Sequence, residues 1–207
     1  MTKTIIIHSF PLSGHAHRVE LFASLAGIKH EVNNINLAEG EHKQAPFLAL
    51  NPVGQVPTIE DGNVVISDSN AILVYLARKY APDYLPQDLQ EEAEVQKFLT
   101  LAAGELAFGP AAARIINVFN STNDIEFAKA TAQSVLTKLE NHLINREFLV
   151  GNKLSIADIA IYSYTAHAPE GGISLAPYPN VQRLLASIES LPGFKAMPTT
   201  KVGLLAE

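Results

Sequence analysis

The sequence predicts an α/β domain followed by an all-α domain. Short β-branched runs alternate with helical spacing in the first part of the chain. After residue 88 strand signals nearly vanish, and alanine- and leucine-rich helical patterns take over. The predicted limits are 1–81 for the α/β domain, 82–88 for a proline-bearing linker and 89–207 for the helical domain.

The order of the first elements predicts a mixed four-stranded sheet. A strand–helix–strand crossover makes parallel neighbours, whereas a hairpin makes antiparallel ones. Asp61-Gly62 between two apolar runs is a strong hairpin signal. The predicted elements are a strand over 4–7, a helix over 15–27, a strand over 30–37, the Asp61-Gly62 hairpin and a helix over 70–80. The segment between 40 and 52 is expected to be a polar loop with at most one helical turn. This order is the thioredoxin-like arrangement.

Helices dominate the second domain, at 91–120, 125–145, 155–167 and 181–191. Gly109-Pro110 is expected to interrupt the first of them, since proline removes a backbone donor and clashes with the preceding turn. Ser155 and Asp158 have the spacing of a capping box, so we expect Asp158 to serve folding rather than chemistry.

Composition excludes several classes of function. A net charge of -6 argues against a general nucleic-acid binder, and the lack of cysteine excludes disulfides and a cysteine nucleophile. The N-terminus lacks a signal-peptide core, and no run approaches the roughly twenty apolar residues that span a bilayer. We therefore expect a cytoplasmic protein. His15 and His17 alone are too weak a signal to predict a metal site.

Four segments, by their order and spacing along the chain, are similar to the cytosolic glutathione S-transferases, and specifically to serine-type bacterial members close to the phi and theta classes. They are GEHKQAPFLALNPVGQVPTIEDG followed by SDSNAILVYLARKY, FLVGNKLSIADIAIYSY at residues 148–164, and PLSGHAHRV near the N-terminus. The resemblance covers nearly the whole chain. It implies glutathione as co-substrate, a hydrophobic electrophile as second substrate, a homodimer and a role in detoxification.

The family keeps the glutathione thiol ionised with a hydroxyl donor, often a tyrosine near the first strand. Here the first tyrosine is Tyr75, so that donor is absent. The resemblance places Ser13 in the role, at the start of the first helix, where free N–H groups favour an anion. Ser9 is the alternative. His17 stands where the serine-type members usually have an arginine, and we expect Arg18 to be structural.

The same resemblance implies a glutathione site from three places in the chain. Val56 is expected to pair its backbone with the cysteinyl part, which requires a cis bond to Pro57. Ser69 is interpreted as a helix N-cap that meets the γ-glutamyl carboxylate, and Asp68 as the partner of the α-ammonium. The polar side chains expected to complete the site are His42, Lys43 and Gln55.

The second substrate is expected between the loop after the first strand and the helical domain. The predicted pocket residues are Phe10, Leu12, Phe108, Ala112, Ile115, Ile116, Tyr164 and His167, with Arg114 as a guess for selecting anionic substrates. Two alternatives stay open: a non-catalytic binding protein of this family, and a glutathione-dependent disulfide reductase. The loop Asn51-Pro-Val-Gly lacks an aromatic key, so any dimer is expected to use a flatter or more polar contact.

Overall fold

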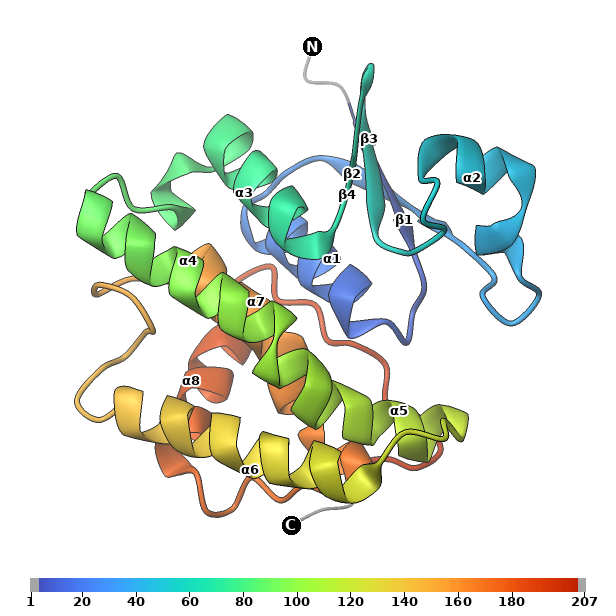
Figure 1. Cartoon of the computed structure of the whole chain (residues 1–207). Coiled ribbons are helices and arrows are strands. Elements are labelled where there is room, and N and C mark those ends of the chain that lie inside the picture. Colours follow the sequence, from blue (N-terminus) through green and yellow to red (C-terminus); the bar gives the residue numbers. More distant parts are fainter. Residues whose placement is uncertain (1–3, 205–207) are drawn as a thin grey trace.

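The computed structural model describes residues 4–204 and contains a sheet-and-helix domain beside a helical one (Figure 1). The sheet holds β1 (Ile5–Ser9), β2 (His30–Asn34), β3 (Thr58–Asp61) and β4 (Val64–Ser67), in the order β2-β1-β3-β4. Strand β1 is parallel to β2 and antiparallel to β3, and β3 is antiparallel to β4. The predicted mixed four-stranded sheet is confirmed.

Helices cover both faces of this sheet. Alternation along β1 sends Ile5 and Ile7 into the core shared with α1 (Gly14–Leu25) and α3 (Ser69–Tyr80), where both side chains are fully buried. On the other face, His8 of β1 meets Phe47 of α2 (Ala45–Leu50) edge-on, with ring centroids 5.9 Å apart. Helix α2 and the short η1 (Glu41–Lys43) occupy the segment for which the sequence predicts a polar loop.

The β3–β4 hairpin is tied to α3 through Asp61. Its carboxylate Oδ2 accepts hydrogen bonds from Tyr75 Oη at 2.8 Å, Lys79 Nζ at 2.6 Å and Tyr80 Oη at 2.7 Å. These donors outweigh the opposing effect of burial and lower the pKa of Asp61. The turn glycine, Gly62, has a φ of 66°, as the predicted tight turn requires.

The helical part begins after η2 (Pro82–Tyr84), and its predicted limits remain a prediction. Its elements are α4 (Leu89–Ala103), the π-helical η3 (Ala107–Ala111), α5 (Ala112–Phe119), α6 (Ile125–His142), α7 (Ile156–Ala166), η4 (Ala168–Gly171) and α8 (Pro179–Glu189). The predicted interruption near Gly109-Pro110 is the π-helical segment. A Cβ at Gly109 would lie 2.7 Å from the backbone nitrogen of Ala132, so this glycine permits the close approach of α6.

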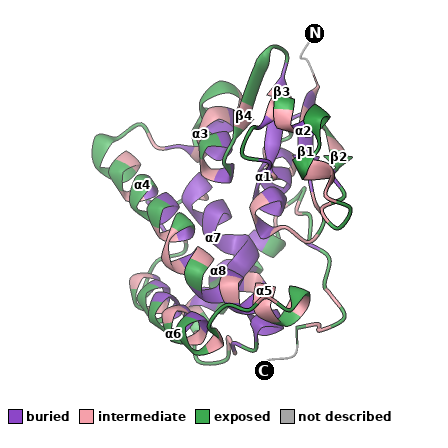
Figure 2. Cartoon of the chain, turned by 45° about the vertical axis from the view of Figure 1, so that its right-hand side comes forward, coloured by how far each residue is buried: buried purple, intermediate pink, exposed green. Residues whose placement is uncertain are grey.

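Helix α7 lies at the centre of the molecule and is buried from Ile156 to Thr165 (Figure 2). It packs against α4 on one side and against α1 of the sheet domain on the other. Its predicted capping box is confirmed: the Ser155 backbone nitrogen donates to Asp158 Oδ2 at 2.9 Å. Asp158 Oδ1 also accepts from the Leu149 nitrogen at 2.8 Å, which fastens the preceding loop to the helix.

By length and composition the run 89–119 could cross a membrane, so the expectation that no run is long and apolar enough is wrong. In the structure it forms α4, η3 and α5, which pack against α6 and α7. Core helices of globular proteins pass the same test, so this run indicates a core helix.

A segment after α8 returns from the helical domain to the sheet domain. Ser24 Oγ of α1 donates to the Gly193 carbonyl at 2.6 Å, and Lys195 Nζ contacts Glu20 at 2.9 Å. Thr200 then donates through its backbone nitrogen to Glu170 Oε1 at 2.7 Å. We call residues 193–200 the return segment.

Candidate active site

A cavity of about 670 Å³ opens between the two domains. Its lining comes from the β1–α1 loop, η1, the loop before β3, α5 and α7: Phe10, Leu12, Ser13, His15, Leu37, Ala38, His42, Lys43, Gly54, Gln55, Val56, Arg114, Ile115, Phe119 and Tyr164. A smaller hollow of about 240 Å³ shares His15, Gln55 and Val56 with it and extends to Asp68 and Ser69. Together they make one elongated groove.

Ser13 lies at the N-terminus of α1 and lines the cavity. It is the N-cap of the helix, and its Oγ accepts from the Ala16 nitrogen at 3.2 Å. Because the cap uses an oxygen lone pair, the hydroxyl hydrogen remains available for a ligand. Ser9 is fully buried and donates to Glu20 Oε1 at 2.5 Å, so it is committed elsewhere. The structure favours Ser13 over Ser9.

The interpretation of Ser69 as a helix cap is wrong. The N-cap of α3 is Asp68, which has a φ of 72° and accepts with Oδ1 from the nitrogens of Asn70 and Ala71, both at 2.9 Å. Ser69 is instead the first helical residue, and its Oγ accepts from Arg18 Nη1 at 3.3 Å. Because Asp68 caps α3 through Oδ1, its other carboxylate oxygen, Oδ2, is the acceptor that remains open to a ligand.

Lys43 stabilises the loop before β3, which forms one wall of the groove. The bond between Val56 and Pro57 is cis, as expected. Lys43 Nζ donates to the carbonyls of Val53 at 3.0 Å and Gly54 at 2.9 Å, so two of its three hydrogens hold this loop. Lys43 therefore stabilises this loop, and one of its ammonium hydrogens remains for a ligand.

His42 and Gln55 also line the cavity. His42 Nδ1 is buried and has no hydrogen-bond partner in the described part of the chain. The backbone carbonyl of Gln55 accepts from Asn51 Nδ2 at 2.8 Å, and within residues 4–204 the Gln55 side chain has no hydrogen-bond partner.

Arg18 is a buried cation between α1 and α3. Arg18 is fully buried and donates from Nη1 to Asn70 Oδ1 at 2.9 Å, while its Nε and Nη2 find no partner within residues 4–204. Burial lowers the pKa of Arg18 to about 10, which still leaves it charged at neutral pH. Arg18 thus links α1 to α3, as expected of a structural residue.

His15 was missed as a site residue, because the sequence suggests only a weak metal ligand. It stands two positions after Ser13 and lines both parts of the groove, with Nδ1 3.3 Å from Ser69 Oγ. Burial, followed by the charge of Arg18, lowers the pKa of His15 to about 4, so the ring is neutral at pH 7. The one signal in the sequence that indicates it is its position in the first turn of α1.

His17 faces away from the groove and joins the domains. Its Nε2 donates to the Lys195 carbonyl at 2.8 Å, so its Nδ1 accepts from Ser163 Oγ of α7 at 2.8 Å. Burial lowers the pKa of His17 to about 4. His17 therefore supplies no cation to the site. Among the described residues, no three His, Asp or Glu side chains gather as metal ligands.

Four of the predicted second-substrate residues line the cavity: Phe10, Leu12, Ile115 and Tyr164. Four others do not, and we withdraw them from the pocket: Phe108, Ala112, Ile116 and His167. Phe108 is 63% exposed on the π-helical segment, whereas His167 is buried with Nδ1 3.3 Å from Glu170 Oε2. Apolar spacing along a helix marks both core and pocket positions, so it could not separate them.

Arg114 lines the cavity, but its charge is largely engaged. Its Nε forms a buried ion pair with Glu170, and its Nη1 donates to the Leu12 carbonyl at 2.9 Å. Only Nη2 lacks a partner in the described chain. Arg114 therefore holds the loop before Ser13 from the helical domain. The apolar wall also includes Phe119, whose ring centroid lies 6.5 Å from that of Phe10 and which the sequence did not suggest.

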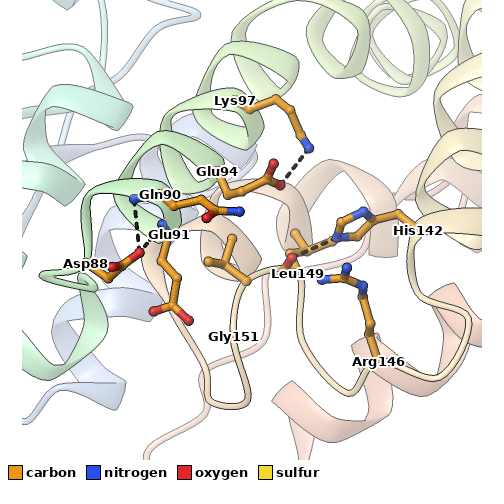
Figure 3. A pocket seen from close by; sticks show the side chains of 10 residues that line it. Asp88, Gln90, Glu91, Glu94, Lys97, His142, Arg146, Leu149 and Gly151 are labelled. Atoms are coloured by element: carbon orange, nitrogen blue, oxygen red, sulfur yellow. Dashed lines mark hydrogen bonds and ion pairs between the residues drawn. The ribbon is translucent and has the colours of Figure 1, made fainter.

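A second hollow of about 520 Å³ lies away from this groove, between the start of α4, the end of α6 and the loop before α7 (Figure 3). Several of its polar groups already have partners: Asp88 caps α4, Glu94 pairs with Lys97 at 2.6 Å, and His142 Nε2 donates to the Leu149 carbonyl at 2.7 Å. We assign no function to it.

Two family profiles match the chain in the order of the two domains. The glutathione S-transferase N-terminal domain matches residues 12–79, and the glutathione S-transferase C-terminal domain matches residues 115–197.

Relatives and solved structures agree with these matches. The chain is 30% identical to glutathione S-transferase Z1 of Arabidopsis thaliana, over 93% of this chain and 90% of that protein. A glutathione S-transferase structure from Pseudomonas fluorescens superposes with a TM-score of 0.89 and 27% identity, covering 94% of this chain and 99% of the other. A glutathione transferase homologue from Drosophila mojavensis with bound glutathione superposes with a TM-score of 0.82 and 25% identity, covering 91% and 89%.

Proposed function

Because the chain belongs to the cytosolic glutathione S-transferase family and is a glutathione S-transferase enzyme, we propose that Ser13 activates the thiol of glutathione for attack on apolar electrophiles. The observation that carries this proposal is the Ser13 hydroxyl at the N-terminus of α1, facing the interdomain cavity. A hydroxyl donor and free helix N–H groups both favour the ionised form of a thiol.

In the proposed reaction, the thiol loses its proton to solvent and the thiolate stays hydrogen-bonded to Ser13 Oγ. Its sulfur lone pair forms the S–C bond while the leaving group departs with the electrons of its own bond to carbon. For an epoxide or activated alkene, those electrons pass to the ring oxygen or the neighbouring carbon, which is then protonated. The apolar wall formed by Phe10, Ile115 and Phe119 suits an apolar electrophile.

The same groove suggests how glutathione is bound. We assign the cysteinyl backbone to Val56, which precedes the cis Pro57, and the α-ammonium to the free oxygen of Asp68. Ser69 and Gln55 face the γ-glutamyl end and the middle of the peptide. The glycyl carboxylate falls to Lys43 and His42, of which Lys43 keeps one free hydrogen.

The decisive measurement is the thiolate absorbance of bound glutathione as a function of pH. In the wild type we expect a thiol pKa well below the ordinary value of about 8.5, and in Ser13→Ala a pKa raised towards it. Ser13→Thr keeps a hydroxyl and serves as the matched control. A wild-type thiol pKa equal to that of free glutathione would refute thiolate activation. It would favour the alternative of a non-catalytic binding protein.

Reaction type is a separate question, answered by a panel of aryl halides, epoxides, hydroperoxides and mixed disulfides. Hydroperoxide reduction would follow from attack of the thiolate on the terminal oxygen, with a second glutathione closing the disulfide. Disulfide reduction is the less favoured reading, because the chain lacks cysteine and glutathione would have to supply both sulfurs.

We further propose a cytoplasmic homodimer acting in detoxification, as is usual in the family. The exposed loop residue Val53, 62% exposed, and the polar neighbours of the cis bond fit a flat contact rather than an aromatic key. Light scattering of the purified protein tests this assembly, and a strictly monomeric species would refute it.

A further inference from the structure

Tyr164 brings a second hydroxyl from the helical domain to the start of α1. Its side chain is 4% exposed and lines the same cavity as Ser13. Its ring lies against Gly14, where an added Cβ would come within 2.7 Å of both Cε1 and Cζ. The His15 ring meets it edge-on, with centroids 5.0 Å apart. A glycine at the first position of α1 thus makes room for this tyrosine.

The surroundings of the Tyr164 oxygen are rich in donors. The backbone N–H groups of His15 and Gly14, in the first turn of α1, lie close enough to the phenol to favour its ionised form. The guanidinium carbon of Arg18 lies 5.9 Å from the ring centroid. Burial raises the pKa of Tyr164, while Arg18, Arg114 and these N–H groups act against that rise, and the net pKa stays above its ordinary value. The phenol therefore carries its proton at neutral pH.

That proton has no acceptor in the part of the chain that the structure describes. Within residues 4–204 the Tyr164 hydroxyl donates to no other residue, although its oxygen faces donors. Three further donor nitrogens without a partner in the described chain belong to two arginines near the same ring, Arg18 (Nε and Nη2) and Arg114 (Nη2). Buried polar groups are nearly always paired in folded proteins, so this group of donors points to an anionic or electron-rich ligand atom in the cavity.

We propose that Tyr164 donates its phenol hydrogen to the sulfur of glutathione, as a second thiolate donor beside Ser13. This inference rests on the proposed function, since it needs glutathione in the groove with its sulfur at the start of α1. The sheet domain supplies one hydroxyl and the helical domain the other. The thiolate site is then complete only when α7 is docked against α1.

The test compares two tyrosines on one helix. Tyr164→Phe removes the hydroxyl and keeps the ring that packs on Gly14. Tyr162→Phe is the matched control, because Tyr162 is also 4% exposed but donates to Glu189 Oε1 at 2.8 Å. The thiol pKa of bound glutathione is measured from thiolate absorbance in both variants, in the wild type and in Ser13→Ala.

We expect Tyr164→Phe to raise the thiol pKa by about half to one unit and Tyr162→Phe to leave it unchanged. The Ser13→Ala/Tyr164→Phe double variant should come closest to the value of free glutathione. If Tyr164→Phe fails to fold, 3,5-difluorotyrosine at position 164 keeps the ring and strengthens the donor, and it should lower the thiol pKa further.

Each other outcome has a distinct meaning. A wild-type thiol pKa equal to that of free glutathione overturns the proposed function and this inference together. A lowered wild-type pKa that rises in Ser13→Ala but not in Tyr164→Phe overturns only the inference. If Tyr164→Phe slows turnover of carbonyl or nitro electrophiles while the thiol pKa stays fixed, the hydrogen goes to the second substrate, and the proposal for sulfur is wrong.

Discussion

Gly14→Ala should destabilise the protein, although alanine is ordinarily the better helix former. The new Cβ would lie 2.7 Å from Cε1 and Cζ of Tyr164, and 3.4 Å is the lower limit of ordinary contact, so ring or helix must move by about 0.7 Å. The ring is buried between α1 and α7 and cannot swing aside. Overpacking of this kind costs about 1–3 kcal/mol, against a gain of up to about 1 kcal/mol from helix propensity. We expect a net loss of about 1–2 kcal/mol.

Urea unfolding of Gly14→Ala measures this loss, and a second background isolates its cause. In Tyr164→Ala the ring atoms Cε1, Cζ and Cδ1, which clash with the new Cβ, are all absent, so adding Gly14→Ala there should be neutral or slightly stabilising. An equal loss of unfolding free energy in both backgrounds would refute the steric explanation. A stabilised single variant would show that the ring has room to move.

Three further predictions concern residues outside the thiolate site. Burial lowers the pKa of His17 to about 4, below the unfolded value of 6.5, so its share of stability is present above pH 6.5 and is lost as the pH falls towards 4. Urea unfolding at pH 7 and pH 5 should differ by about 2 kcal/mol from this group, and His17→Gln should reduce the difference. Asp158→Ala leaves the buried nitrogens of Leu149 and Ser155 without their acceptor, so we expect a loss of about 3 kcal/mol in thermal unfolding; an unchanged thiol pKa in the folded fraction would fit a purely structural role, and a shifted one would contradict it. Lys43→Met removes two hydrogen bonds that brace the groove, and calorimetry should show glutathione binding weakened about tenfold; unaltered affinity would show that the loop holds its shape without Lys43.

The sequence predicts the fold well because its signals are local. Asp61-Gly62 specifies a hairpin turn, and Ser155 with Asp158 specifies a helix start, since each motif involves only neighbouring residues. The predicted N-cap of α3, Ser69, was wrong by one residue, because the N-cap is Asp68. Asp68 and Ser69 are both good N-caps, and the choice depends on the positive φ that Asp68 adopts in three dimensions.

The site is predicted in part, because its wall joins residues distant in sequence. The stretch around Val56 carries a recognisable motif, whereas the cavity depends on how α5 and α7 pack against α1. Phe108 and Ile115 have the same apolar character, yet only Ile115 faces the cavity, because the π-helical segment changes the helical phase between them. His15 has one signal in the sequence, its position in the first turn of α1, and that position alone does not distinguish a binding residue from any other residue of the turn.

The return segment has a consequence for how the chain matures during synthesis. His17, near the beginning, needs the carbonyl of Lys195 for its Nε2 hydrogen, and Ser24 bonds to Gly193. A nascent chain emerges from the ribosome starting at its N-terminus, so the sheet domain waits for residues made after all the main helices before its own buried groups are paired. Until then the imidazole of His17 lacks the carbonyl that accepts its Nε2 hydrogen. We expect release or truncation before residue 193 to yield a chain whose first domain is incompletely ordered. The segment synthesised last therefore completes the packing of the domain synthesised first.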